Sequence, residues 1–111
     1  MNKDVIIMNE ATNDGQTIYL YYDAMIGGYL AYGLSAFYIT MVTEPFMSYS
    51  DELQMPVALL RREHILYLRQ SLTKVDHAKK EFYIFQMRTR VGDAGYNRWA
   101  QNILTKHQGG R

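Results

Sequence analysis

Apolar and polar residues alternate just after a turn signal at Asn13-Asp14-Gly15. In Gln16–Asp23, QTIYLYYD, successive residues divide into an aliphatic-rich set and a set of threonine and tyrosine. Aromatic and β-branched residues in such alternation favour a pleated strand over a helix. The pattern predicts a strand over Gln16–Asp23 with both faces at least partly covered.

The next segment, Ala24–Val42, contains no charged residue and approaches the length of a membrane-spanning helix. Gly27 and Gly28 interrupt it, tyrosines dilute it, and acidic residues flank it where Lys and Arg are usual. We therefore expect no membrane span. Glycine adopts positive φ without steric cost, so a turn at the two glycines should join the first strand to a second over Tyr29–Tyr32.

A helical period begins after Gly33, because apolar residues recur at the i, i+3, i+4 and i+7 spacing of one helix face. This predicts a short helix over Leu34–Thr43, ended by Glu44-Pro45 because a residue before proline avoids helical ψ. The polar segment Met47–Glu52 is expected to be a loop. Gln54–Leu60 is predicted to be a strand, with Pro56 at a sheet edge or strand start.

The clearest helix is predicted over Arg61–Lys74, where aliphatic residues form one stripe. Polar residues lie off that stripe, namely Arg62, Glu63, Arg69 and Gln70. A charged connection over Val75–Lys80 should lead to a central strand over Glu81–Arg88, which is apolar or aromatic on both faces. Asp93 is positioned to cap a final helix that ends near Gly109-Gly110.

The expected order is β-β-α-β-α-β-α, which indicates the α+β class. We predict a mixed sheet of about four strands with helices packed against it. A chain of 111 residues fits one domain spanning 1–111, with a basic helix and tail within 93–111.

Charge is distributed unevenly although the net charge is only +1. Residues 1–78 hold five Lys or Arg against nine Asp or Glu, while residues 79–111 hold seven against two. A basic segment of this kind can follow an anionic partner, or it can be a solvated tail. The chain has no cysteine and no secretory signal at its start, so we expect a cytoplasmic protein.

The residues 29–36, Tyr-Leu-Ala-Tyr-Gly-Leu-Ser-Ala, resemble the strand and helix start of the N-terminal mismatch-recognition domain of the MutS family. A second block is similar to that family at Met55-Pro56-Val57-Ala58-Leu59, followed by a helix and by a strand closing on Gln86. The resemblance covers roughly residues 17–88 and implies a stand-alone, divergent domain I fold.

This sequence departs from the MutS pattern at the residues that read a mismatch. The family uses a Phe-x-Glu unit there, and the alignment places Gly28 and Leu30 at those positions. A phosphate-binding G-x-x-x-x-G-K-[ST] motif does not occur in the chain. The resemblance therefore implies a relative without mismatch reading or ATP hydrolysis.

No catalytic motif stands out in the sequence, so we expect a non-enzymatic protein without cofactor or metal. The three histidines, His64, His77 and His107, lack the spacing of metal ligands. Acidic pairs such as Asp51-Glu52 are expected to be solvated.

Two binding functions remain. The first is phosphate-backbone binding to DNA or RNA through the basic third, with aromatic rings as stacking or interface residues. The predicted phosphate contacts are Lys79, Lys80, Arg88, Arg90, Arg98 and Lys106, and the predicted aromatic residues are Tyr29, Tyr32, Tyr96 and Trp99. The second is a protein-interaction or homo-oligomerisation module that uses its tyrosine-rich surface.

Overall fold

The computed structural model describes residues 3–79 and 82–109, and for 73–79 it describes the backbone alone. Four helices and six strands follow one another along the chain. In order they are α1 (Lys3–Ala11), β1 (Thr17–Asp23), β2 (Gly28–Tyr32), α2 (Gly33–Thr40), β3 (Phe46–Ser50), β4 (Met55–Leu60), α3 (Arg62–Ser71), β5 (Thr73–Lys79), β6 (Phe82–Gln86) and α4 (Tyr96–Gly109).

The strands form one sheet in the order β3-β4-β2-β1-β6-β5, and every described pairing is antiparallel. The α+β class is confirmed. The expected mixed sheet of about four strands is corrected to an antiparallel sheet of six. Three successive β-β-α units, β1-β2-α2, β3-β4-α3 and β5-β6-α4, follow the first helix.

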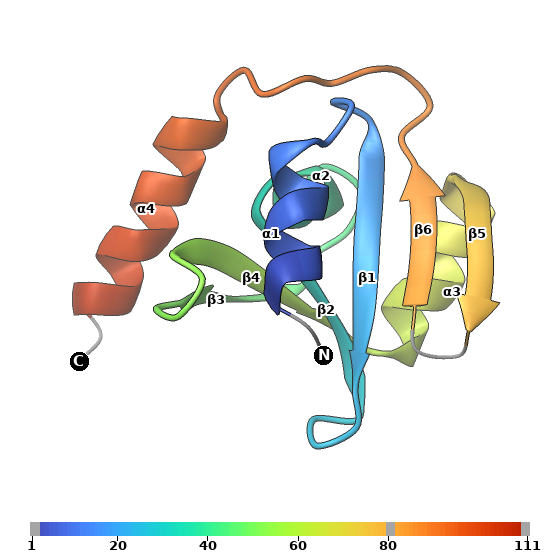
Figure 1. Ribbon diagram of the computed structural model, residues 1–111, viewed down its shortest axis with the longest axis horizontal. Coiled ribbons are helices and arrows are strands. Elements are labelled where there is room, and N and C mark those ends of the chain that lie inside the picture. Colours follow the sequence, from blue (N-terminus) through green and yellow to red (C-terminus); the bar gives the residue numbers. More distant parts are fainter. Residues whose placement is uncertain (1–2, 80–81, 110–111) are drawn as a thin grey trace.

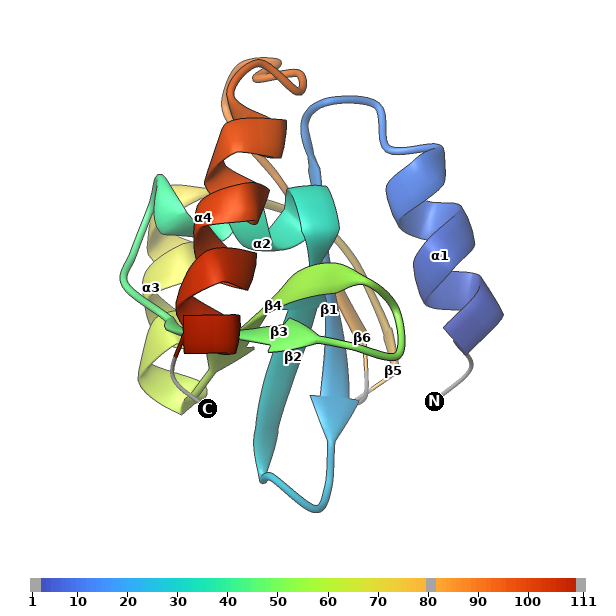
Figure 2. The same cartoon turned by 90° about the vertical axis from the view of Figure 1, so that its left-hand side faces the viewer.

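The two faces of the sheet carry different numbers of helices. Figure 2 shows α1 alone on one side of the strands and α2, α3 and α4 on the other. The larger core lies on the three-helix side, where Ile18, Leu20 and Phe85 are fully buried beneath residues of α2 and α3. On the other side Ile6 of α1 packs against Tyr21, Leu30 and Tyr32.

Four predicted strands are present within a residue or two of their expected ends: β1, β2, β4 and β6. β4 lies inside the sheet between β3 and β2, and Pro56 is tolerated as its second residue. The predicted helices are shorter than expected, because α2 ends at Thr40 and α3 ends at Ser71. The last helix begins at Tyr96, whose backbone N–H donates to the carbonyl oxygen of Asp93 at 3.0 Å.

Three elements were missed. Residues 3–11 form α1, most of β3 lies in the expected polar loop, and the edge strand β5 begins at Thr73, inside the expected helix, and takes up most of the expected charged connection. β3 and β5 lie at the two edges of the sheet, where each pairs on one side only within the described sheet. An edge strand needs less apolar character than a central one, which explains why the apolar pattern did not reveal them.

Segment Ala24–Val42, the one membrane candidate, divides into a turn, β2 and α2 (Figure 1). Among the helices formed by residues 3–79 and 82–109, none is both long and apolar enough to cross a bilayer.

Candidate functional site

A cavity of about 340 Å³ opens between α3 and the end of the β1–β2 hairpin. Tyr22, Tyr29 and Tyr83 contribute from three strands, and Arg62 and Arg69 contribute from α3. We call this cavity the arginine–tyrosine groove. It combines aromatic rings with two cationic side chains, and its described lining includes no acidic residue.

The strand register brings the three tyrosines together. Tyr22 of β1 lies opposite Tyr29 of β2, and β6 pairs with the other edge of β1. The ring centroids of Tyr22 and Tyr29 are 5.3 Å apart, and those of Tyr29 and Tyr83 are 5.2 Å apart, both in edge-to-face geometry. Such pairs hold the rings in fixed orientations. Burial and the neighbouring Tyr83 raise the pKa of Tyr29, so its hydroxyl stays neutral at physiological pH.

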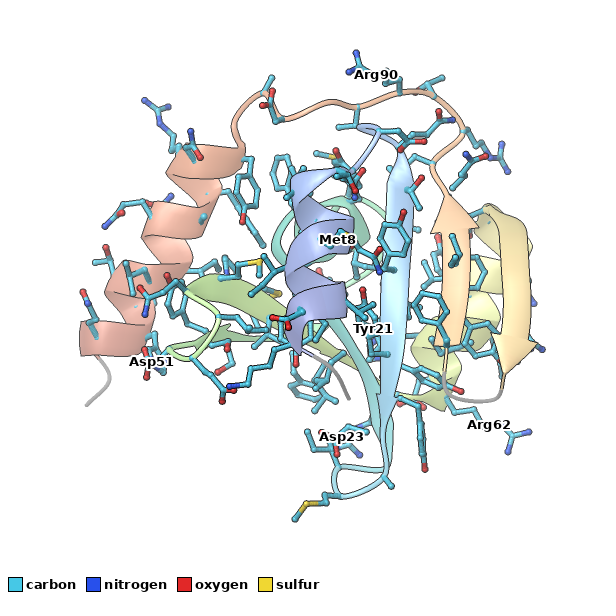
Figure 3. All side chains as sticks on the ribbon, in the orientation of Figure 1. Met8, Tyr21, Asp23, Asp51, Arg62 and Arg90 are labelled. Atoms are coloured by element: carbon cyan, nitrogen blue, oxygen red, sulfur yellow. The ribbon has the colours of Figure 1, made fainter. Side chains whose placement is uncertain are left out.

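The helical repeat places the two arginines on one face of α3. Arg62 and Arg69 are seven residues apart, which is close to two turns and a rise of roughly 10 Å. Arg69 is held in place, because it donates to the Tyr83 hydroxyl at 2.8 Å and its guanidinium carbon lies 5.3 Å from the Tyr83 ring centroid. Arg62 instead extends away from the ribbon near the start of α3 (Figure 3).

The charge of these two arginines is not neutralised locally. In the described parts of the chain, no ion pair joins either guanidinium to a carboxylate. The two ion pairs found there lie elsewhere, between Lys3 and Glu52 and between His107 and Asp51. The groove is therefore a positively charged recess with aromatic walls, which suits a ligand that carries both an anionic group and a flat ring.

A second cavity of about 290 Å³ adjoins the groove and shares Gly27, Gly28 and Arg62 with it. Arg61 and Glu63 at the start of α3 also line this adjoining cavity. A Cβ atom on Gly28 would lie 2.8 Å from the Leu60 carbonyl oxygen, so glycine is needed where β2 passes β4.

The predicted aromatic residues do not share one site. Tyr29 lines the groove, whereas Tyr32 is buried on the opposite face of the sheet beside Ile6. Tyr96 and Trp99 pack on Phe37, with centroids 5.8 and 5.2 Å from its ring, and so attach α4 to the core. These two rings serve docking of the helix.

The predicted cations are spread over the molecule. Arg88 follows β6 and donates to the Ser71 carbonyl oxygen at 3.0 Å, and Arg90 donates to the Asp14 carbonyl oxygen at the same distance. Arg98 and Lys106 are exposed on α4, which packs against β3 and β4 at the opposite edge of the sheet from β5. Lys80 lies outside the described residues, and for Lys79 the backbone alone is described.

Arg62 and Arg69 were not among the predicted site residues. In the sequence they lie off the aliphatic stripe of the helix, and the uneven charge favours the C-terminal third instead. Their seven-residue spacing on a helix that follows tyrosine-rich strands was the signal that could have identified them.

A buried carboxylate forms a second polar cluster. Glu10 of α1 accepts from the Ser35 backbone N–H at 3.0 Å and from the Ser35 hydroxyl at 2.7 Å. The Ser35 Oγ in turn accepts from the Tyr19 backbone N–H at 3.0 Å. Burial raises the pKa of Glu10 to about 7, against the lowering effect of these hydrogen bonds. Tyr32, which precedes α2, provides no side-chain cap for this helix. Glu10 instead accepts a hydrogen bond from a backbone N–H group in its first turn.

Histidines in the described side chains serve the fold. His64 Nδ1 accepts from the Arg61 backbone N–H at 2.9 Å, and Nε2 lies 3.2 Å from the Glu44 carbonyl oxygen, which fixes the start of α3. Within the described ranges, no group of three or more His, Asp or Glu residues is placed to hold a metal ion.

Comparisons with protein-family models, with curated proteins and with solved structures found no match to this chain. The function must therefore be inferred from the chain's own residues.

Proposed function

We propose that this protein is a small non-enzymatic protein that binds single-stranded nucleic acid in the arginine–tyrosine groove. The observation that carries the proposal is the placement of Arg62 and Arg69 beside Tyr22, Tyr29 and Tyr83 in one recess. Binding of single strands needs cations for the phosphates and aromatic faces for the bases, and the groove offers both.

The exposed Arg62 supplies one cation for a backbone phosphate, and Arg69, which Tyr83 holds in place, supplies another. The Arg69 guanidinium already lies against the Tyr83 ring, and its outer face can stack on a base. Tyr22 is 38% exposed and provides a second ring surface at the mouth of the groove. Because none of these contacts reads a base edge, they support binding without strong sequence preference.

Arg88 can extend the charged track beyond the groove. Its guanidinium lies at the C-terminal end of α3 through the bond to Ser71, and Arg69 lies two residues before Ser71. Three arginines thus follow the length of α3 from its first residue to its last. Of the cations predicted from sequence, Arg88 is the described side chain that joins this track.

A nucleic-acid ligand also agrees with the resemblance of residues 17–88 to the MutS mismatch-recognition domain. The structure gives a physical reason why mismatch reading is not part of the proposal. Gly28 has no room for a larger side chain, and Leu30 is buried toward α1. We place the protein in the cytoplasm, since a chain without cysteine suits a reducing compartment.

The alternative function is homo-oligomerisation, and α1 favours it more than the tyrosines do. Val5, Ile7 and Met8 of α1 are 45%, 47% and 65% exposed, although all three are apolar. Apolar side chains clustered on one exposed helix can mark an interface. Light scattering across a concentration series tests this alternative, because a constant monomer mass would contradict it.

The main test is fluorescence anisotropy with a labelled oligothymidylate of about fifteen nucleotides, titrated between about 50 and 200 mM salt. We expect binding that weakens as salt rises. Arg62→Glu should weaken binding at least about tenfold, whereas Arg98→Glu, the same charge change on α4, should alter it less than about twofold. Absence of binding at low salt, or equal losses in the two variants, would contradict the proposal.

A further inference from the structure

Glu63 is an unexpected neighbour for a phosphate-binding groove. It lines the adjoining cavity together with Arg61 and Arg62, whereas the described lining of the groove itself contains no carboxylate. A carboxylate repels a phosphate, so this cavity is a poorer place for the backbone than the space between Arg62 and Arg69.

The second residue of α3, the exposed Glu63, lines this cavity, and contacts of the next residue fix the backbone there. His64, the next residue, accepts from the Arg61 backbone N–H at 2.9 Å and contacts the Glu44 carbonyl oxygen at 3.2 Å. The Arg61 guanidinium carbon lies 5.4 Å from the Phe46 ring centroid, so this cation is directed toward β3. The adjoining cavity therefore presents one carboxylate acceptor, and Arg62 lies on the border that it shares with the groove.

A carboxylate acceptor distinguishes the bases by their hydrogen-bonding groups. Cytosine, adenine and guanine each carry an exocyclic amino group that can donate to a carboxylate. Thymine and uracil carry a carbonyl oxygen on C4, where cytosine carries its amino group, and a carboxylate repels that oxygen. The cavity adjoins the groove through Gly27, Gly28 and Arg62, so a base next to a phosphate held in the groove can enter it.

We propose that Glu63 is a specificity-determining residue that makes the adjoining cavity select bases with an exocyclic amino group. This inference rests on the proposed binding of single strands in the groove. It adds a preference among bases to the contacts of the groove with phosphates and base faces, which do not depend on the sequence.

The test compares oligodeoxycytidylate with oligothymidylate of equal length in the anisotropy assay at neutral pH. Both are pyrimidine strands with the same number of phosphates, so their difference reports the base. We expect the cytidine strand to bind about fivefold more tightly. Glu63→Gln should reduce that ratio to less than about twofold, because the neutral amide both donates and accepts. Glu44→Gln, an exposed residue outside both cavities with the same charge change, should leave the ratio unchanged.

The outcomes separate this inference from the function on which it rests. Equal, salt-sensitive binding of the two strands would overturn the role of Glu63 and leave the groove as a binding site. Persistence of the preference in Glu63→Gln would also overturn that role. Absence of binding by either strand at low salt would overturn both proposals.

Discussion

Helices α3 and α4 both carry two cationic side chains seven or eight residues apart, and both lie near aromatic rings. In α4 the rings of Tyr96 and Trp99 face the core, and Arg98 and Lys106 remain on the exposed side. In α3 the rings belong to neighbouring strands and line a cavity that Arg62 and Arg69 also border. The same residue types therefore attach one helix to the core and build a recess beside the other.

The difference follows from which element supplies the aromatic residues. A helix that carries its own aromatic residues buries them when it packs, and its cations then point away from them. Strands can present rings beside a helix whose cations face the same space. Residue composition of a segment is thus a weaker guide to binding than the placement of cations and rings across elements.

The largest expected effect is a pH dependence of stability that arises at Glu10, where α1 contacts the start of α2. The folded-state pKa of Glu10, about 7, is above the ordinary glutamate value of 4.5. Stability from neutral Glu10 is therefore fully present below about pH 4.5 and is lost as pH rises through 7. A shift of this size corresponds to about 3 kcal/mol of unfolding free energy.

Urea denaturation at several pH values measures this dependence, and Glu10→Gln should remove most of it. The arginines of α3 stay charged at all of these pH values. The affinity of the folded protein for single-stranded nucleic acid should therefore change little. Stability that rises steadily with pH, with no difference in Glu10→Gln, would contradict the account of this carboxyl.

A smaller effect should separate the aromatic residues of α4 from those of the groove. Trp99→Ala removes a half-buried ring that contacts Phe37 and Tyr96, and should cost about 2 kcal/mol of unfolding free energy. The affinity of the folded variant for single-stranded nucleic acid should remain within about twofold of that of the unaltered protein. Thermal denaturation measures the change in stability, and anisotropy below the melting transition measures the affinity. A large loss of affinity in a folded Trp99→Ala protein would indicate that α4 forms the binding site instead.

The converse result is expected for Tyr22→Ala. This ring is 38% exposed, so its removal should change unfolding free energy by less than about 1 kcal/mol. Loss of a stacking surface should weaken strand binding about fivefold, at the lower end of the range for base stacking on aromatic residues. Tyr22→Phe is the control, because it keeps the ring and should keep the affinity.

The fold was predictable where apolar patterning was strong. β1, β2, β4 and β6 carry the alternation or apolar content of inner strands, and α3 carries a single aliphatic stripe. β3 and β5 show neither the alternation nor the apolar content of the inner strands. An edge strand forms by pairing with one neighbour, and this pairing does not require an apolar sequence. Missing these two strands concealed the three successive β-β-α units.

Part of the site was predictable as well. Tyr29 was identified as a ring available for stacking or an interface, and it lines the groove. Arg62 and Arg69 could not be found by counting charges along the chain, because residues 1–78 as a whole hold more acidic than basic side chains. The register of the strands and the packing of α3 bring the two arginines to the groove that Tyr83 lines. This arrangement depends on the pairing of β6 with β1, which the sequence alone does not reveal.

Photochemical crosslinking tests the central comparison most directly. A single strand containing a photoreactive thymidine analogue would be bound at low salt, irradiated and digested, and mass spectrometry would locate the adducts. We expect adducts at Tyr22, Tyr29 or Tyr83 in the arginine–tyrosine groove. Adducts concentrated at Tyr96 and Trp99 would contradict it and return the binding site to α4.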